Sequence, residues 1–482
     1  MKISLALIPF VCLLAAPFTV KGEEATVIIK ARNLDGRELT YHRSYNGVYL
    51  STFTPAALAA DSTSTITMPV DGIERMSIIA NDPDRKLPGV YKPFYVLPGT
   101  TQVTVDPLAE EKVTVIPATG NRLDGMAAQS ADSIYDFWFA LVTWQKDKLG
   151  LWNDSIPSAA TTKLSEYVDS LCKAFTGASP VVRKAMERDA RLEALMVYDV
   201  CRKKDNAEEW NNELSRLRNS IVMSDPANAR NPFFAERLAA NFYYEDTYPD
   251  ENIPDDITTD SLLTLKTDYF LRVMPGKAAE AAIGTMLYND GARNTFSSNA
   301  PALTERFKKL FPSSGLIPLL DKKAEENRAF NNPATSDDII FIDNSNIKTL
   351  AELLAPYKGT PVLIDLWATW CGPCRESFSH VGPIQEYAAE NGVQLLYISI
   401  DEQPGIEEKW KRMAHYHNLK GHHVLINPDI KKEVYSTFGT NGILSIPRFA
   451  IVDRSGNISL CPQPLSESAD FAPLRALLDQ AK

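Results

Sequence analysis

The 482-residue sequence has little cysteine and little histidine, with six residues of each. So few cysteines exclude a small domain held together mainly by disulfides. Basic charge is also scarce, because 61 Asp and Glu residues outweigh 50 Lys and Arg and leave a net charge of −11. A chain of this charge lacks the basic surface that nucleic acid requires, so we expect no nucleic-acid partner.

Long hydrophobic runs are absent except at residues 3–20, which follow Lys2. A positive residue, an apolar stretch and the ending Val20-Lys21-Gly22 are typical of a secretory signal, which we predict over residues 1–22. Prolines interrupt the run, which argues against a permanent membrane span, although an uncleaved signal anchor stays open. Export predicts an oxidising location, the periplasm, where a dithiol needs a source of electrons to stay reduced.

Two cysteines three positions apart are the most informative feature of the chain. The apolar run 361–366 is followed by Trp-Ala-Thr-Trp-Cys-Gly-Pro-Cys over residues 367–374. This order predicts a strand, a short turn and a helix from about residue 372 to 390. Cys371 would then lie at the helix start, exposed, where free N–H groups and the helix dipole favour a thiolate. We expect Cys371 to attack and the more buried Cys374 to resolve the mixed disulfide.

The same segment resembles the thioredoxin superfamily, and within it the TlpA/ResA-like thiol–disulfide oxidoreductases. The resemblance covers about residues 338–481 and implies a C-terminal α/β thioredoxin-like fold that works without a cofactor. It implies that Asp365, six residues before Cys371, is a buried carboxylate that moves protons to and from the resolving thiol. Tyr397 stands where thioredoxins carry a lysine beside that carboxylate, and residues 403–425 resemble the helical insertion of the TlpA/ResA group.

The resemblance also implies the surface that meets the substrate. Ile446-Pro447 precedes an apolar strand and resembles the cis-proline element opposite the dithiol, so we expect a cis bond and a loop against Cys371. Substrate contacts are expected from four residues: Trp370, Gly372, Pro373 and Ile446. The expected partners are disulfide-containing proteins and a membrane thiol that donates electrons. The oligomeric state stays open.

Two other chemistries deserve a test against the residues. A lone pair of cysteines can be half of a zinc site, but the second half would have to come from Cys461 or from the histidines at 415, 417, 422 and 423. We expect no metal, because His415 and His417 face different sides of a predicted helix. A peroxidase of the peroxiredoxin type would have Thr or Ser at position 368, where this chain has Ala.

The chain is long enough for several domains. Residues 23–118 predict a β-sandwich, because short β-branched runs alternate with turn residues. Those runs are residues 25–30, 64–68, 76–80, 101–105 and 112–116. Residues 119–332 predict an α-helical middle region, and 335–482 the thioredoxin-like domain. Apolar residues at helical spacing mark residues 134–142, 164–175 and 262–273. Cys172 and Cys201 fall at opposite ends of a predicted helical hairpin, which favours free thiols over a disulfide.

These patterns predict a periplasmic thiol–disulfide oxidoreductase that most readily acts as a reductase, because Gly-Pro is the dipeptide of low-potential thioredoxin. Two alternatives stay open: an oxidase or isomerase of disulfides, and a binding protein whose dithiol is a redox latch. Residues 331–336 read as a linker, so we expect that removing residues 1–334 leaves a folded, redox-active unit.

Overall fold

The computed structural model forms two compact units. One comprises residues 1–286 and 307–317, and the other comprises residues 287–306 and 318–482. The structure describes residues 23–45, 48–50, 63–81, 89–134, 158–200, 208–231, 233–248, 253–254, 257–274, 276–293, 295–403, 405–439, 443–461 and 472–481. The expected signal peptide at residues 1–22 and Cys201 lie outside these ranges. The expected domain boundaries at residues 118 and 335 stay predictions.

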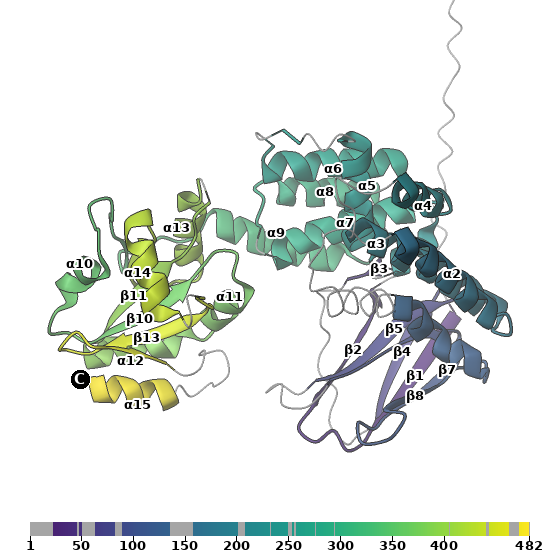
Figure 1. Cartoon of the computed structure of the whole chain (residues 1–482), viewed down its shortest axis with the longest axis horizontal. Coiled ribbons are helices and arrows are strands. Elements are labelled where there is room, and N and C mark those ends of the chain that lie inside the picture. The colour runs from purple at the N-terminus through teal and green to yellow at the C-terminus, as the bar shows by residue number, and fades with distance from the viewer. Residues whose placement is uncertain are drawn as a thin grey trace, which may run out of the picture. The chain divides into compact units, whose positions relative to one another are not determined.

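The first unit begins with two four-stranded sheets (Figure 1). Their strands are β1 Glu23–Ala31, β2 Glu38–Tyr45, β3 Val48–Tyr49, β4 Thr63–Val70, β5 Glu74–Asn81, β6 Val90–Val96, β7 Gly99–Val105 and β8 Val113–Ile116. One sheet has the order β4-β1-β7-β8 and the other β3-β2-β5-β6. All neighbours are antiparallel except β1 and β7, which run parallel.

One buried cluster takes side chains from both of these sheets. Alternate residues of β1, such as Val27 and Ile29, are buried together with Ile78 of β5 and Phe94 of β6. A period of two places such residues on one face of a strand, which is why the β-branched runs could be recognised in the sequence. All five expected strands are present. The expectation missed β2, which is mostly polar, the two-residue strand β3, and β6, which contains Pro93.

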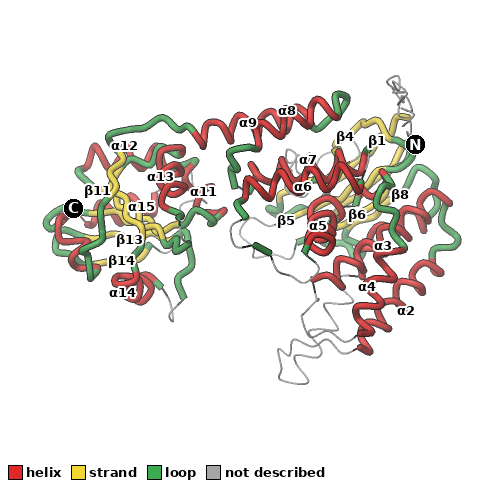
Figure 2. Tube along the Cα trace, turned by 90° about the horizontal axis from the view of Figure 1, so that it is seen from above, coloured by secondary structure: helices red, strands yellow, loops and turns green. Residues whose placement is uncertain are grey.

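Helices make up the rest of the first unit. After a helical stretch at residues 122–134, they include α2 Ser158–Ala174, α3 Pro180–Val200, α4 Glu208–Asn219, η1 Pro226–Arg230, η2 Phe234–Leu238, α5 Ala239–Thr247 and α6 Thr259–Val273. Helices α2, α3 and α4 lie side by side (Figure 2). The expected helices at 164–175 and 262–273 are present, and the second starts at an N-cap, Thr258, whose side chain accepts from Ser261 N–H. Cys172 on α2 is a half-buried free thiol.

The second unit is built on a six-stranded sheet of order β14-β13-β10-β11-β12-β9. Its strands are β9 Ile339–Phe341, β10 Val362–Trp367, β11 Gln394–Ser399, β12 Gly421–Leu425, β13 Arg448–Val452 and β14 Ile458–Leu460. Strands β9, β10, β11 and β12 run parallel to one another, whereas β13 is antiparallel to β10 and β14 is antiparallel to β13. The helices are α10 Leu350–Leu354, η3 Ala355–Tyr357, α11 Gly372–Phe378, α12 Val381–Asn391, α13 Glu407–Tyr416, α14 Pro428–Phe438 and α15 Ala472–Ala481.

The single helix expected over residues 372–390 is wrong in one respect, because it is two helices. Helix α11 ends at Phe378 and α12 begins at Val381. Pro383 explains the break: a continuous helix would need its missing N–H to bond to the carbonyl of Ser379, and its ring would clash with that carbonyl. In the observed arrangement Pro383 lies in the first turn of α12, where no donor is needed.

The second unit also includes chain that precedes residue 335. Helices α7 Lys277–Ala292, α8 Ala300–Leu310 and α9 Ile317–Asn331 fall wholly or partly within its ranges. The ring of Phe296 stacks on that of Phe330 at 4.3 Å, and both rings contact Tyr416 of α13. Phe296 and Phe330 are buried in the same hydrophobic cluster as the central strand β10. The core of the second unit therefore begins upstream of the expected linker.

Within the described ranges, the longest and most apolar helices still fall short of what a membrane crossing requires.

We predict that fragment 335–482 is less stable than fragment 287–482, because the shorter fragment lacks both stacked phenylalanines. Losing a buried Phe typically destabilises a protein by about 3–5 kcal/mol. Urea unfolding of the two fragments measures the difference. Phe330→Ala in the longer fragment is the control and should remove most of it. Equal stability of the two fragments would show that the upstream segment is only a linker.

Candidate active site

The two cysteines of the motif form a disulfide at the start of α11. The strand β10 that leads to them is buried at every residue, and it delivers the chain to Cys371, the N-cap of the helix. The Cys371 sulfur accepts a hydrogen bond from the backbone N–H of Cys374 at 3.2 Å. Pro373 lies in the first helical turn, where it removes no needed donor. The sulfur thus occupies the place of an N-cap acceptor.

The expectation that Cys371 is exposed is wrong for this disulfide form. Cys371 is 4% exposed and Cys374 is fully buried. The cause is local: the Cys371 side chain folds back toward the first turn of α11, where it bonds to the Cys374 sulfur and accepts its N–H. The expected order of burial nevertheless holds, since Cys371 is the more exposed of the two.

Asp365 is a buried carboxyl in the middle of β10, with 5% of its surface exposed. Burial disfavours the anion and raises the pKa of Asp365 to about 8. Among the described residues, none hydrogen-bonds to its Oδ1. The burial that the resemblance implies for Asp365 is therefore confirmed, and with this pKa the group can gain or lose a proton near neutral pH.

A row of polar side chains crosses the sheet from Asp365. Tyr397 of β11 pairs with Asp365 in the strand register, and His423 of β12 pairs with Tyr397. The rings of Tyr397 and His423 stack at 4.7 Å with 8° between their planes. Burial, and then the nearby Asp365, raise the pKa of Tyr397, whereas burial lowers the pKa of His423 to about 4. The expected place of Tyr397 beside Asp365 is confirmed, and no cation from β11 or β12 stabilises the carboxylate there.

The residues expected to meet a substrate differ in exposure. The Ile446–Pro447 peptide bond is cis, as predicted, and both residues are half-buried just before β13. Trp370 is 57% exposed, a large exposed area for an indole beside a disulfide. Pro373 is exposed and Gly372 half-buried. That the proline loop lies against Cys371 stays a prediction.

The sequence interpretation missed the side chains that hold the turn before Cys371. The buried carboxylate of Asp401, just beyond β11, accepts hydrogen bonds from the backbone N–H and the hydroxyl of Thr369, both at 2.8 Å. Arg375 of α11 donates to the Thr369 carbonyl at 2.9 Å. The only sequence signal was an acidic residue directly after an apolar strand, which is where polar groups of parallel sheets gather.

Three of the histidines considered as zinc ligands contact a hydroxyl, a backbone carbonyl or an aromatic ring. His422 Nδ1 lies 2.9 Å from the Tyr357 hydroxyl, and His423 Nε2 lies 2.7 Å from the Leu419 carbonyl. His417 packs on the ring of Phe378, and burial, followed by the charge of Arg375, lowers its pKa to about 4. In the described part of the chain, His, Cys, Asp and Glu side chains form no group of three that could hold a metal ion.

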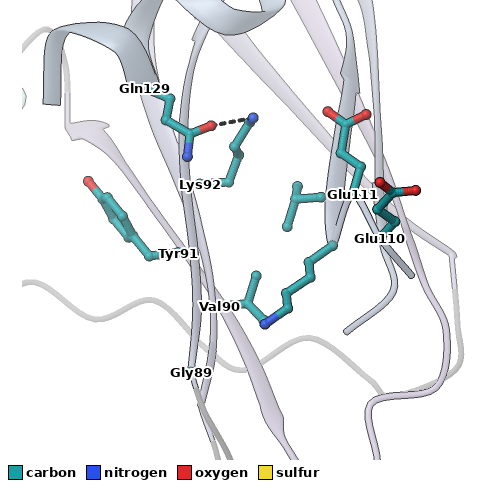
Figure 3. Close-up of a pocket in the computed structure, with 9 residues that line it drawn as sticks. Gly89, Val90, Tyr91, Lys92, Glu110, Glu111 and Gln129 are labelled. Atoms are coloured by element: carbon teal, nitrogen blue, oxygen red, sulfur yellow. Dashed lines mark hydrogen bonds between the residues drawn. The ribbon is translucent and has the colours of Figure 1, made fainter. Parts of the chain in front are cut away.

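A separate pocket lies in the first unit, against β6 and β8 (Figure 3). Its volume is about 350 Å³. Lys92 donates to Gln129 across its rim, and burial lowers the pKa of Lys92 while Glu111 opposes that shift. The pocket presents lysines and glutamates together and has no nucleophile or acid–base pair comparable to the dithiol.

Residues 317–463 match the family model named Redoxin. The chain is 29% identical over 160 residues to the thiol:disulfide interchange protein DsbE of Pseudomonas fluorescens, and this match covers 32% of this chain and 76% of that protein. It is 24% identical over 105 residues to the thiol-disulfide oxidoreductase ResA of Bacillus thuringiensis, covering 22% and 56%. A thioredoxin of Streptomyces clavuligerus is 38% identical over 56 residues, covering 11% and 49%. The chain thus spans about half the length of the ResA and thioredoxin relatives.

Two solved structures are also similar to part of the chain. A thiol:disulfide interchange protein of the thioredoxin family from Chlorobium tepidum is 24% identical, with a TM-score of 0.23, and the match covers 27% of this chain and 83% of that chain. A thiol:disulfide interchange protein from a Bacteroides species is 23% identical, with a TM-score of 0.23, and covers 27% and 80%.

We predict that Asp365→Asn changes how stability depends on pH. Below about pH 4 the carboxyl is protonated in both states; above it the unfolded carboxyl ionises, while the folded one keeps its proton up to about pH 8. The contribution of Asp365 to stability therefore falls as pH rises through this window, by up to about 1.4 kcal/mol per pH unit. The Asn variant lacks this fall, so its stability relative to wild type should rise with pH. Urea unfolding of fragment 287–482 in its disulfide form, from pH 5 to 8, measures both slopes.

Asp453→Asn is the matched control. Hydrogen bonds from Asn457 hold the pKa of the exposed Asp453 below its usual value, so its titration falls outside this window. This variant should keep the wild-type slope. A wild-type slope in Asp365→Asn as well would mean that Asp365 is ionised in the folded protein.

Proposed function

Because the C-terminal domain belongs to the TlpA/ResA-like thiol–disulfide oxidoreductases of the thioredoxin superfamily, we propose that the protein reduces disulfides of other proteins through Cys371 and Cys374. One observation carries the proposal: the Cys371 sulfur lies at the start of α11 and accepts the Cys374 N–H. A hydrogen bond and a helix N-terminus both favour a thiolate over a thiol. Cys371 is accordingly the attacking group.

The reaction has two exchange steps. The Cys371 thiolate attacks one sulfur of a substrate disulfide, forms a mixed disulfide and releases the first substrate thiolate, which takes up a proton. Cys374 then loses its proton and attacks the Cys371 sulfur, and the second substrate sulfur leaves. Two electrons pass from the dithiol to the substrate, and the product is the Cys371–Cys374 disulfide that the structure holds.

Asp365 is proposed to serve the second step as a proton carrier. A resolving thiol that is fully buried, as Cys374 is, needs a base to reach its thiolate. With its pKa raised to about 8, Asp365 takes up a proton readily near neutral pH and returns it when the disulfide is reduced again. An ordinary carboxyl, ionised throughout this range, would bind that proton much more weakly.

The substrate is proposed to lie across Trp370, Gly372 and Pro373, with its backbone along Ile446. Trp370 supports this role because its indole is largely exposed beside the disulfide, where it offers apolar contact area. Ile446 supports it because the residue before a strand-entry proline has N–H and C=O groups available for an extended partner chain. Pro447 fixes that turn in its cis form.

The location and the direction of electron flow are proposed from the sequence and the relatives. A predicted signal at residues 1–22 supports export to the periplasm. The Gly372-Pro373 dipeptide supports the reducing direction, with electrons supplied by a membrane thiol donor. The two N-terminal sheets share one buried cluster, which supports a β-sandwich that presents or spaces the redox domain.

We predict that Cys371→Ser abolishes reduction of insulin, because no thiolate remains to attack, and that Cys374→Ser accumulates mixed disulfides, because none can be resolved. Insulin turbidity measures the first effect and non-reducing gels measure the second. Cys172→Ser is the control: it removes a thiol of the first unit and should reduce insulin at the wild-type rate. Trapping by Cys371→Ser would reverse the two roles, and full activity in both variants would remove the dithiol from the reaction.

A further inference from the structure

The turn between β10 and Cys371 is held at every polar atom of Thr369. Its backbone N–H and its hydroxyl both donate to the Asp401 carboxylate at 2.8 Å. Its carbonyl accepts from Arg375 Nη1 at 2.9 Å. Thr369 is 2% exposed and Asp401 1% exposed, so water cannot replace these partners. Such a set of buried hydrogen bonds strongly restricts where the next residues can lie.

The Asp401 carboxylate is itself fixed. Ser399 at the end of β11 donates from its hydroxyl to Asp401 Oδ2 at 2.7 Å. Each carboxylate oxygen of Asp401 therefore accepts from Thr369, and one also accepts from the strand that pairs with β10. The anchor of the turn is part of the sheet.

What this turn positions is the sulfur of Cys371, two residues further on. The backbone N–H of Cys371 donates to the Ala368 carbonyl at 3.0 Å, and its sulfur accepts from Cys374 N–H at 3.2 Å. Thr369 lies between Ala368 and the cysteine, and Arg375 connects Thr369 to the helix that supplies the donor. A change in the Thr369 peptide therefore alters how the sulfur faces the helix start.

We propose that Thr369 and Asp401 are positioning residues that keep the Cys371 sulfur aligned with the N-terminus of α11 and so set its reactivity. This rests on the proposed function, in which Cys371 is the attacking group. The Asp401 carboxylate thus acts on the reactive cysteine indirectly, through Thr369, and does not contact the substrate.

The charge of Asp401 and its hydrogen bonds affect Cys371 in opposite directions. A nearby anion alone disfavours a second anion, so removing the charge would raise the thiolate fraction of Cys371. Loss of alignment would lower that fraction, because the sulfur leaves its donor. Arg375 and Lys409 are cations near Asp401 that moderate its field. A substitution at Thr369 separates the two effects, since it leaves every charge in place.

The test is Thr369→Val against Thr369→Ser in the full, reduced chain. The pH profile of iodoacetamide alkylation at Cys371, read by peptide mass spectrometry, gives the thiol pKa. In Thr369→Val, which lacks the hydroxyl, we expect a rise of about half a pKa unit, or about threefold slower alkylation well below the pKa. Thr369→Ser keeps the hydroxyl and should match wild type. An unchanged pKa in Thr369→Val would overturn the proposal.

Ser297→Ala controls for a general loss of stability. Ser297 is a buried residue of the same unit whose hydroxyl donates to the Asp290 carboxylate, so this substitution, like Thr369→Val, removes one buried hydroxyl and no charge. This variant should unfold at lower urea but keep the wild-type Cys371 pKa. If it shifts that pKa as far as Thr369→Val does, positioning is the wrong explanation.

Two further arms complete the experiment. Ser399→Ala leaves Thr369 intact but removes one donor to the Asp401 carboxylate, so we expect a smaller rise in the Cys371 pKa. This variant tests the proposal even if Thr369→Val fails to fold. An unchanged Cys371 pKa in Ser399→Ala would count against the proposal. Insulin reduction by the wild-type chain tests the proposed function separately. A wild-type chain that reduces no disulfide while Thr369→Val still shifts the thiol pKa would sink the function but keep the positioning.

Discussion

The redox site depends on one constraint: a sulfur must replace the N-cap oxygen of a helix. Cys371 accepts the N–H of Cys374, the very residue to which its sulfur is bonded. A side chain can do this only if the preceding strand ends at a fixed point, because the N-cap residue is extended while the next is helical. Full burial of β10 and the hydrogen bonds of Thr369 meet that condition. The position of the Cys371 sulfur is thus built into the connection between strand and helix.

The same sheet that fixes the turn also holds an acid that would be unstable as an anion. Asp365, Tyr397 and His423 occupy one register row, and at neutral pH burial favours the uncharged form of each. Three uncharged polar groups are easier to bury than one unpaired charge. No donor in the described part of the chain reaches Asp365 Oδ1, and a buried oxygen without a donor destabilises the fold. A purely structural position would not keep such a group, which favours a role in proton transfer.

Local patterns predicted the elements that carry the dithiol, since a buried strand, a cysteine pair and an N-terminal proline are signals within one short stretch. The burial of Asp365 was implied by the resemblance to thioredoxins, and its raised pKa follows from that burial. The break at Pro383 was readable and was missed. The bond from Thr369 to Asp401 joins residues 32 positions apart and depends on the register of β10 with β11, which no local pattern specifies. The burial of Cys371 was missed for another reason: it belongs to the closed disulfide, in which the side chain folds back toward the first turn of α11.

The upstream segment belongs to the redox unit for a reason that only packing reveals. Phe296 has a left-handed backbone, with φ of 53°, which is unfavourable for a bulky residue. The Asn331 side chain donates to the Phe296 carbonyl, and the Phe296 ring stacks on the ring of Phe330. From there ring contacts pass through Tyr416, His417 and Phe378 to Trp367, the last residue of β10. Strain at Phe296 is tolerable only if this packing holds it, so the segment before residue 335 is part of the core behind the dithiol.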